Sequence, residues 1–314
     1  MPQLLDIIIV NWNAGKQLRN CVLSVQKFAS GSVGRIIIVD NGSTDGSLDE
    51  VESLAGVDFI RTGKNLGFAA ACNIGTAKSS SPYVLFLNPD SRVYAKSLSV
   101  PLQFLERAEN AKVGICGIQL VGQSGKVSRT CARFPTFGRL IVSSLGLSRL
   151  PTFLGSGIHM NDWDHAHTRR VDHVIGAFYM IRQEVLRACD GFDERFFMYF
   201  EDLDLSRRAR LAGWDSWYLT EAQAFHAGGG TSRQVKTDRL FYSLRSRLLY
   251  ALKHFSMFQA WFLIVITATV EPFTRTFYCL ALLDIAGVRN TWSAFKMLWQ
   301  GMRRIITANA PFHS

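Results

Sequence analysis

Short runs of β-branched and apolar residues alternate with helical patterns along the first 120 residues of the chain. Helices are predicted between these runs, over Lys16–Phe28 and Ala69–Lys78. A strand that is apolar on both faces has to be covered on both faces, so the pattern predicts a mainly parallel sheet between layers of helices. The fold class is therefore α/β, and ligands are expected beyond the carboxyl ends of the strands. The predicted strands are Ile7–Val10, Ile36–Asp40, Val57–Ile60, Tyr83–Asn88 and Val113–Gly117.

The rest of the chain divides into a second group of regular elements and an apolar helical tail. Residues 121–170 are less regular, with a helix predicted only near Leu140–Leu147. From Asp238 onward the pattern is helical and strongly apolar. We predict a main domain over residues 1–235 and a C-terminal helical region over residues 236–314. The elements predicted before the tail are a strand over Val171–Arg182, helices over Gln183–Ala188 and Glu201–Trp214, and a strand over Ser216–Leu219.

Chain length and cysteine spacing describe the expected environment. At 314 residues the chain can bury a full core without disulfides or metals. Its six cysteines are scattered without CxxC or CxH spacing, as small buried residues are. The N-terminal residues run almost at once into a core strand and do not have the pattern of an export signal. We expect reduced cysteines and a cytoplasmic protein.

The tail carries most of the positive charge. The net charge is +10, and +8 of it comes from eleven Lys and Arg against three Asp and Glu from Thr231 onward. The apolar runs Phe255–Val270 and Thr276–Val288 are shorter than the roughly 20 residues that cross a bilayer. Basic residues and tryptophans flank them, which suits an anionic lipid surface. We predict peripheral contact with the inner face of the cell membrane and no nucleic acid partner. The alternative is a helical hairpin that packs on the main domain or in a homo-oligomer.

Two glycine-containing turns follow predicted strands. Asp40 ends a buried strand and begins the turn of VDNGSTDGS, where a carboxylate can accept a hydrogen bond from a nucleobase and the turn amides can approach phosphate or ribose. The alternative is a cap on the next helix. In NLGFAAACNIG, Gly67 places a turn before small helical residues, so a ligand can come close to the backbone. Tight packing of the helix on the sheet is the alternative there. We predict that Asn65 and Gly67 lie near the bound nucleotide.

A carboxylate and a histidine at separate strand ends indicate a metal site. Asp90 lies just beyond the strand that ends in LNPDS, where it can bind Mg²⁺ or Mn²⁺ together with diphosphate oxygens. His226 follows a later strand and precedes three glycines, and its imidazole can complete a metal site with Asp90. Turns and single histidines of this kind are also common as purely structural features.

The segment DGFDERFFMYFEDLDL, Asp190–Leu205, combines five aromatic side chains with a run of carboxylates. Glu201 and Asp202 open a helix, where carboxylates are ordinarily caps. An Asp between aromatic walls and near other carboxylates can instead have its pKa raised toward that of a useful general base. We predict Asp202 as a general base, with Glu201 in a supporting role.

Taken in order, these motifs resemble the GT-A glycosyltransferases of family 2, and specifically the rhamnosyltransferase-like branch. The motifs are IIIVNWN, VDNGSTDGS, NLGFAAACNIG, FLNPDS, GAFYMIR, GFDERFFMYFEDLDLSRRARLAGW and HAGGGTS. The resemblance covers about Leu4 to Arg247. It implies a GT-A fold, with a catalytic domain at residues 1–235. The apolar helices of residues 236–314 follow this domain in the sequence.

The resemblance also implies roles for single residues. Asp40 binds the nucleotide base, Asp90 is the metal-binding Asp of a DXD-like element, Asp202 is the catalytic base, and His226 lies near metal and diphosphate. Asn88 replaces the first Asp of DXD, so only one carboxylate of that turn is available. The donor-binding residues predicted from these motifs are Asn11, Asn13, Asp40, Asn41, Asn65, Gly67 and Asn88.

Other nucleotide-binding classes lack their signatures in this sequence. There is no GxGxxG after the first strand and no GxxxxGK[ST]. A nucleotidyltransferase would usually have a glycine-rich basic loop after the first strand, and a mere nucleotide-sugar-binding protein would have no chemical reason to keep Asp40, Asp90, Asp202 and His226 together. We predict a metal-dependent, inverting glycosyltransferase of the hexosyltransferase class. The resemblance suggests dTDP-L-rhamnose as donor and a cell-surface polysaccharide or its lipid-linked precursor as acceptor.

Overall fold

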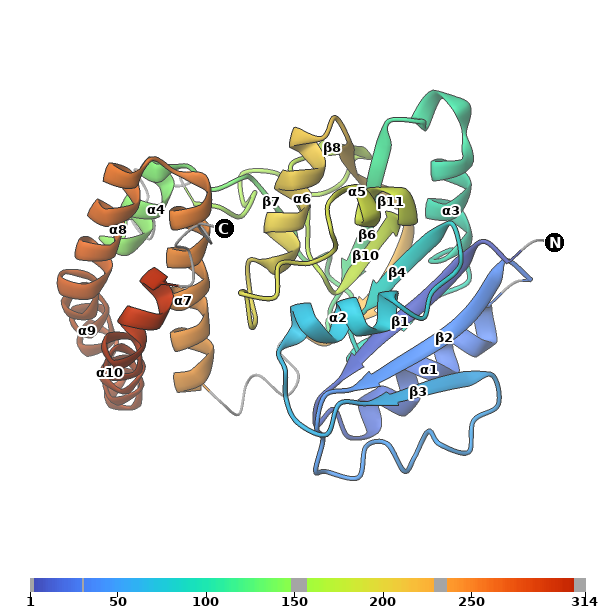
Figure 1. The fold of residues 1–314 in the computed structure, drawn as a ribbon, viewed down its shortest axis with the longest axis horizontal. Coiled ribbons are helices and arrows are strands. Elements are labelled where there is room, and N and C mark those ends of the chain that lie inside the picture. Colours follow the sequence, from blue (N-terminus) through green and yellow to red (C-terminus); the bar gives the residue numbers. More distant parts are fainter. Residues whose placement is uncertain (1–2, 30, 148–156, 229–235, 308–314) are drawn as a thin grey trace.

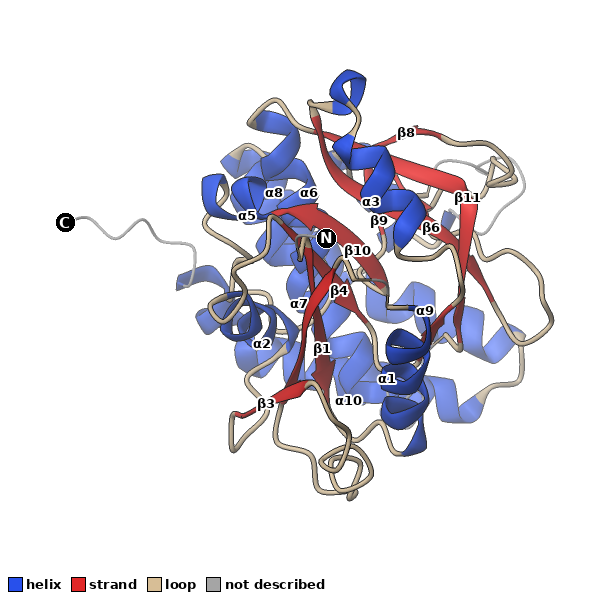
Figure 2. Cartoon of the chain, turned by 90° about the vertical axis from the view of Figure 1, so that its right-hand side faces the viewer, coloured by secondary structure: helices blue, strands red, loops and turns tan. Residues whose placement is uncertain are grey.

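The computed structural model describes residues 3–29, 31–147, 157–228 and 236–307. A nine-stranded sheet has the order β3-β2-β1-β4-β10-β6-β11-β5, with β8 paired to β11 beside that path, and β7 pairs with β9 in a small second sheet (Figure 1). Figure 2 shows the twist of the large sheet between its helices. The strands are β1 Leu5–Asn11, β2 Val33–Asp40, β3 Val57–Arg61, β4 Tyr83–Leu87, β5 Ser91–Val93, β6 Val113–Val121, β7 Cys131–Ala132, β8 Arg169–Val171, β9 His173–Val174, β10 Phe178–Arg182 and β11 Asp215–His226.

Strand β1 illustrates why the first half of the sheet folds as predicted. Every residue of β1 is buried. Ile7 and Ile9 belong to the core under α1 (Lys16–Phe28), whereas Ile8 belongs to the core under α2 (Phe68–Thr76). Successive side chains of a strand point to opposite faces, so a continuous apolar run fills both layers. β3, β2, β1 and β4 are parallel to one another, as expected, and α1 begins and ends at the predicted residues.

The predicted strand Val171–Arg182 is wrong as a single element. It forms β8, β9 and β10, and β10 runs antiparallel between β4 and β6. The chain leaves regular structure between β9 and β10, where Gly176 passes close to Asp202. An apolar run shows burial but not the number of turns within it, and here a helix start from elsewhere in the chain occupies the space beside the break.

Strand β11 is longer than the predicted Ser216–Leu219 and ends at His226. Its final residues pair antiparallel with β5, so that His226 lies opposite Ser91. The sequence pattern predicted neither β5 nor the helix α3 (Ser99–Glu106) that follows it. The pairing matters for the site because Ser91 follows Asp90 in the chain, so His226 is placed next to Asp90.

The C-terminal helices and α4 share an apolar cluster that also includes Ala132, Phe196 and Leu203 of the main domain. Figure 1 shows them gathered at one end of the molecule, with α7 beside the loop that leads into α6. The predicted helix near Leu140–Leu147 is present as α4, a few residues earlier. The remaining helices are α4 Phe137–Ser144, α5 Gln183–Ala188, α6 Glu201–Leu211, α7 Lys236–His254, α8 Met257–Thr269, α9 Glu271–Ala281 and α10 Ile285–Thr307.

Candidate active site

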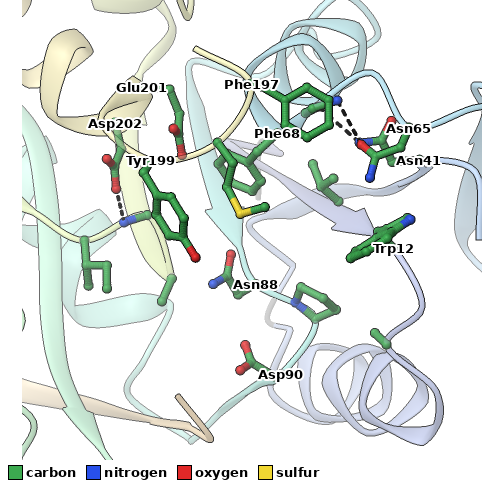
Figure 3. A pocket seen from close by; sticks show the side chains of 18 of the residues that line it. Trp12, Asn41, Asn65, Phe68, Asn88, Asp90, Phe197, Tyr199, Glu201 and Asp202 are labelled. Carbon is green, nitrogen blue, oxygen red and sulfur yellow. Dashed lines mark hydrogen bonds between the residues drawn. The ribbon is translucent and has the colours of Figure 1, made fainter. Parts of the chain in front are cut away.

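A cavity of about 350 Å³ opens where three parallel strands end. Trp12 follows β1, Asn41 follows β2 and Asn88 follows β4, and all three side chains line it (Figure 3). The carboxyl ends of parallel strands are the usual ligand edge of an α/β sheet, and the volume suits a small organic ligand. The cavity is therefore where the strand pattern placed a ligand.

One end of the cavity is built by a hydrogen-bonded pair of asparagines. Asn41 Nδ2 donates to Asn65 Oδ1 at 3.0 Å and to the Gly67 carbonyl at 3.1 Å. Gly67 has φ +90°, and a Cβ there would stand 2.5 Å from the Phe197 carbonyl oxygen, so only glycine fits. Figure 3 shows Trp12 at this end, where its indole ring offers a flat apolar surface. Three of the predicted donor-binding residues, Asn41, Asn65 and Gly67, thus line the cavity.

Three other predicted donor-binding residues do not line this cavity. Asn11 is fully buried, and its Nδ2 donates to Asp40 Oδ1 at 2.9 Å. Asp40 Oδ2 accepts the Ser43 N–H at 3.2 Å, and Asn13 Oδ1 accepts the Thr44 N–H at 2.8 Å. The structure uses these side chains to hold the loop after β2. A role of Asn11, Asn13 and Asp40 in donor binding stays a prediction.

Asp90 and His226 meet at the wall of the cavity. Asp90 Oδ1 lies 3.3 Å from His226 Nε2, and both side chains are largely buried. Among the described residues, no group of three or more His, Cys, Asp and Glu side chains has the arrangement of a metal site. Two protein ligands nevertheless fit Mg²⁺ or Mn²⁺, because such ions commonly take one or two protein groups and fill the rest with water and substrate phosphate. Asn88 lines the same wall.

The opposite wall carries the acidic pair. Asp202 Oδ2 accepts the Gly176 N–H at 2.7 Å, and Oδ1 accepts the Leu203 N–H at 2.8 Å. Glu201 is 6% exposed, and its Oε2 is buried with no hydrogen-bond partner among the described residues. Burial, and then the neighbouring charge of Asp202, raise the pKa of Glu201 well above its ordinary range. Glu201 therefore faces the cavity as a carboxyl group that tends to hold a proton (Figure 3).

Several residues that line the cavity were not predicted from the sequence. Trp12 lies between Asn11 and Asn13, two predicted donor-binding residues, and Tyr199 lies in the aromatic run before the acidic pair. Arg239, in the first turn of α7, also lines the cavity although it belongs to the predicted helical region. The aromatic composition of both motifs was a usable signal for Trp12 and Tyr199. No local signal separates Arg239 from the other basic residues of the tail. The last four residues of HAGGGTS, 229–232, lie outside the described residues.

Comparison of the sequence with known proteins finds a matching glycosyltransferase family and similar transferases. Residues 6–187 match the family described as Glycosyl transferase family 2. The chain is 28% identical over 246 residues to an N-acetylglucosaminyl-diphospho-decaprenol L-rhamnosyltransferase of Mycobacterium tuberculosis, covering 72% of this chain and 76% of that protein. It is 27% identical over 224 residues to Rhamnosyltransferase WbbL of Escherichia coli, covering 69% of this chain and 81% of that one.

Solved structures show the fold. A mannosyltransferase of Pyrobaculum calidifontis, solved in complex with GDP-Man and Mn²⁺, has a TM-score of 0.54 at 13% identity and covers 97% of this chain and 85% of its own. TarS of S. aureus, residues 1–349, has a TM-score of 0.53 at 14% identity and covers 94% and 91%. With the mixed sheet and its flanking helices, these likenesses confirm the predicted GT-A fold.

Proposed function

This chain belongs to glycosyl transferase family 2, and we propose that it transfers L-rhamnose from dTDP-L-rhamnose to a hydroxyl group of a polysaccharide or lipid-linked precursor, with inversion at the anomeric carbon. One observation carries the proposal. A single cavity has the Asp90–His226 pair on one wall and the Glu201–Asp202 pair on the other, beside the asparagine-lined end. The names of the two rhamnosyltransferase relatives support the choice of sugar.

Asp202 is assigned the role of general base. Its carboxylate takes the proton of the acceptor hydroxyl, and that oxygen forms a bond to the anomeric carbon on the face opposite the leaving group. The bond from the anomeric carbon to the diphosphate oxygen breaks with its electron pair, and nucleoside diphosphate leaves. The N–H groups of Gly176 and Leu203 hold the carboxylate in one orientation.

The nucleotide is assigned to the end of the cavity that holds Trp12 and the Asn41–Asn65 pair. A base can stack on the indole ring, and the two amide side chains offer both donors and acceptors to base and ribose. Asp90 and His226 would hold Mg²⁺ or Mn²⁺, and the ion would neutralise negative charge on a departing diphosphate. In its protonated form, which its raised pKa favours, Glu201 can donate a hydrogen bond to a sugar hydroxyl from the other wall.

The C-terminal helices supply a surface for a membrane-bound acceptor. Among the described residues, no single helix has the length and apolarity of a membrane span, but α8 and α9 meet both criteria together across a 43° bend. Large apolar side chains on α8, α9 and the turn before α10 are exposed, and Arg289, Lys296, Arg303 and Arg304 follow on α10. An exposed apolar face with basic residues near it suits the headgroup region of an anionic bilayer. The most exposed of these side chains are Met257, Phe258, Phe273, Phe277, Leu282 and Leu283.

A panel of nucleotide sugars tests the chemistry. Purified protein is incubated with each donor, and release of nucleoside diphosphate to water is measured. The anomeric configuration of the freshly released sugar is followed by time-resolved NMR, before the two anomers equilibrate in water. Release from dTDP-L-rhamnose above all other donors is expected. Equal release from every donor would refute the sugar assignment, and a retained anomeric configuration would refute direct displacement.

Flotation with anionic and with zwitterionic vesicles, at low and high salt, tests the membrane surface. Wild-type protein should float with anionic vesicles, and less so at high salt because surface charges are screened. The double variant Phe277→Asp, Leu283→Asp should stay at the bottom of the gradient. If wild-type protein and variant both stay there, or if the exposed face instead forms a dimer in solution that the variant breaks, the membrane assignment is wrong.

A further inference from the structure

The backbone immediately before the acidic pair is strained. Tyr199 and Phe200 both have φ +68°, in the left-handed region that bulky side chains rarely adopt. Phe200 is the N-cap residue of α6, and Glu201 and Asp202 are the first two residues of the helix. Two consecutive left-handed aromatic residues persist only where surrounding contacts hold them. The conformation of this turn sets the direction in which Tyr199, Glu201 and Asp202 enter the cavity.

One face of α7 supplies contacts to this turn. Arg239 Nε donates to Tyr199 Oη at 3.2 Å, and the Tyr242 ring stacks on Phe197 with centroids 4.5 Å apart. Ser246 Oγ donates to the Met198 carbonyl at 2.7 Å. Residues 239, 242 and 246 have the spacing of a single helical stripe, so one face of α7 meets the turn at three points.

The same face continues to the start of α6. Tyr250 lies against Phe200, with ring centroids 5.6 Å apart. Lys253 Nζ donates to Asp204 Oδ2 at 2.9 Å, and His254 Nε2 lies 2.7 Å from Asp204 Oδ1. Asp204 is fully buried in the first turn of α6, two residues after Asp202. Helix α7 therefore holds both the strained turn and the helix that carries the acidic pair.

We propose that α7 is a positioning element of the active site, and that Ser246 is the positioning residue that keeps the Met198–Tyr199 peptide in the orientation the acidic pair requires. The proposal rests on the function proposed above. The Ser246 hydroxyl fixes the carbonyl of that peptide, and rotation of the peptide plane changes φ of Tyr199. The catalytic unit then extends beyond residue 235 and includes the first helix of the C-terminal region.

Ser246→Ala tests this assignment. Ser246 is fully buried, and alanine fills almost the same space without the hydroxyl. Turnover should fall about tenfold to a hundredfold, the scale of a misplaced catalytic group, while KM for the donor changes less than about twofold. Amide hydrogen exchange should become faster at residues 197–202. Ser293→Ala, an exposed position on α10, is the matched control and should change none of these quantities.

A double-mutant cycle separates positioning from ordinary packing. Asn tolerates left-handed backbone far better than Phe, so Phe200→Asn reduces the need for an external hold. Ser246→Ala should then cost less turnover in the Phe200→Asn background than in wild type, because the two sites are coupled. Wild-type turnover and exchange in Ser246→Ala would overturn the proposal, as would equal losses in both backgrounds or a loss seen only in donor KM. If wild-type protein transfers no sugar at all, the proposed function fails, and the exchange measurement still tests whether α7 holds the turn.

Discussion

Replacing Asp202 by Asn should remove turnover and leave donor binding nearly intact. The amide cannot take the acceptor proton, and loss of a general base lowers turnover about 100- to 10,000-fold. That range corresponds to about 2.7–5.4 kcal/mol of activation free energy. The structure adds a cost in stability, because the carboxylate accepts N–H bonds from Gly176 at 2.7 Å and Leu203 at 2.8 Å, and Asn has one acceptor oxygen for the two. An N–H without a partner costs about 1–3 kcal/mol, and the partial exposure of this side chain favours the low end.

The assay separates these two effects. Turnover is measured with the preferred donor, nucleoside diphosphate affinity by calorimetry, and stability by thermal unfolding. Glu201→Gln is the matched control, because burial raises the pKa of Glu201 and the wild-type side chain already tends to be neutral. It should keep turnover within about tenfold of wild type, since one neutral hydrogen-bonding group replaces another.

The opposite pattern would refute the assignment. If Asp202→Asn keeps turnover while Glu201→Gln loses it, Glu201 is the base and Asp202 only fixes the backbone of the site. Asp193, another carboxylate of the same segment, is a poor candidate for the general base. It lines a second cavity. Burial raises its pKa, but Arg195 and Lys253 outweigh burial and hold the pKa below its usual range.

Three further results are expected. Chelation by EDTA should abolish transfer and Mg²⁺ or Mn²⁺ should restore it, with Asp90→Ala behaving like chelated wild type; full activity in chelator would remove the metal from the mechanism. Gly67→Ala should lower both activity and stability, by about 1–3 kcal/mol for the left-handed backbone alone, because its Cβ would stand 2.5 Å from the Phe197 carbonyl oxygen; unfolding curves that overlay wild type would contradict this. Glu201→Gln should raise stability at neutral pH: a carboxyl whose folded pKa is raised lowers stability as pH rises above its unfolded pKa, so the two unfolding temperatures should converge only in acid. Equal unfolding temperatures at pH 7 would show that burial of the Glu201 carboxyl group does not lower the stability of the fold.

The amino-acid sequence alone determined the elements that depend on local pattern. Both ends of α1 and of α5 were predicted at the observed residues. The bounds of β1, β2, β3 and β4 were predicted to within a few residues. Side-chain periodicity encodes such elements directly, since each residue shows by its polarity whether it is buried. The position of Asp90 followed from the same pattern, because a polar residue that ends a buried strand lies at an edge of the sheet. Asp202 was selected differently, as an acidic residue that follows an aromatic run at the start of a predicted helix, and α6 does begin there.

Only the tertiary structure decided which of these polar residues meet. Asn11 and Asp40, two predicted donor-binding residues, hydrogen-bond to each other instead of lining the cavity. The sequence suggested that Asp90 and His226 could share a metal site, and the pairing of β11 with β5 is what brings these residues together from more than a hundred positions apart. The left-handed turn at Tyr199 could not be predicted, because bulky aromatic residues disfavour that conformation locally and contacts from α7 hold it. Local propensity describes what a segment prefers alone, and non-local packing can outweigh it by supplying hydrogen bonds and buried area from elsewhere in the chain.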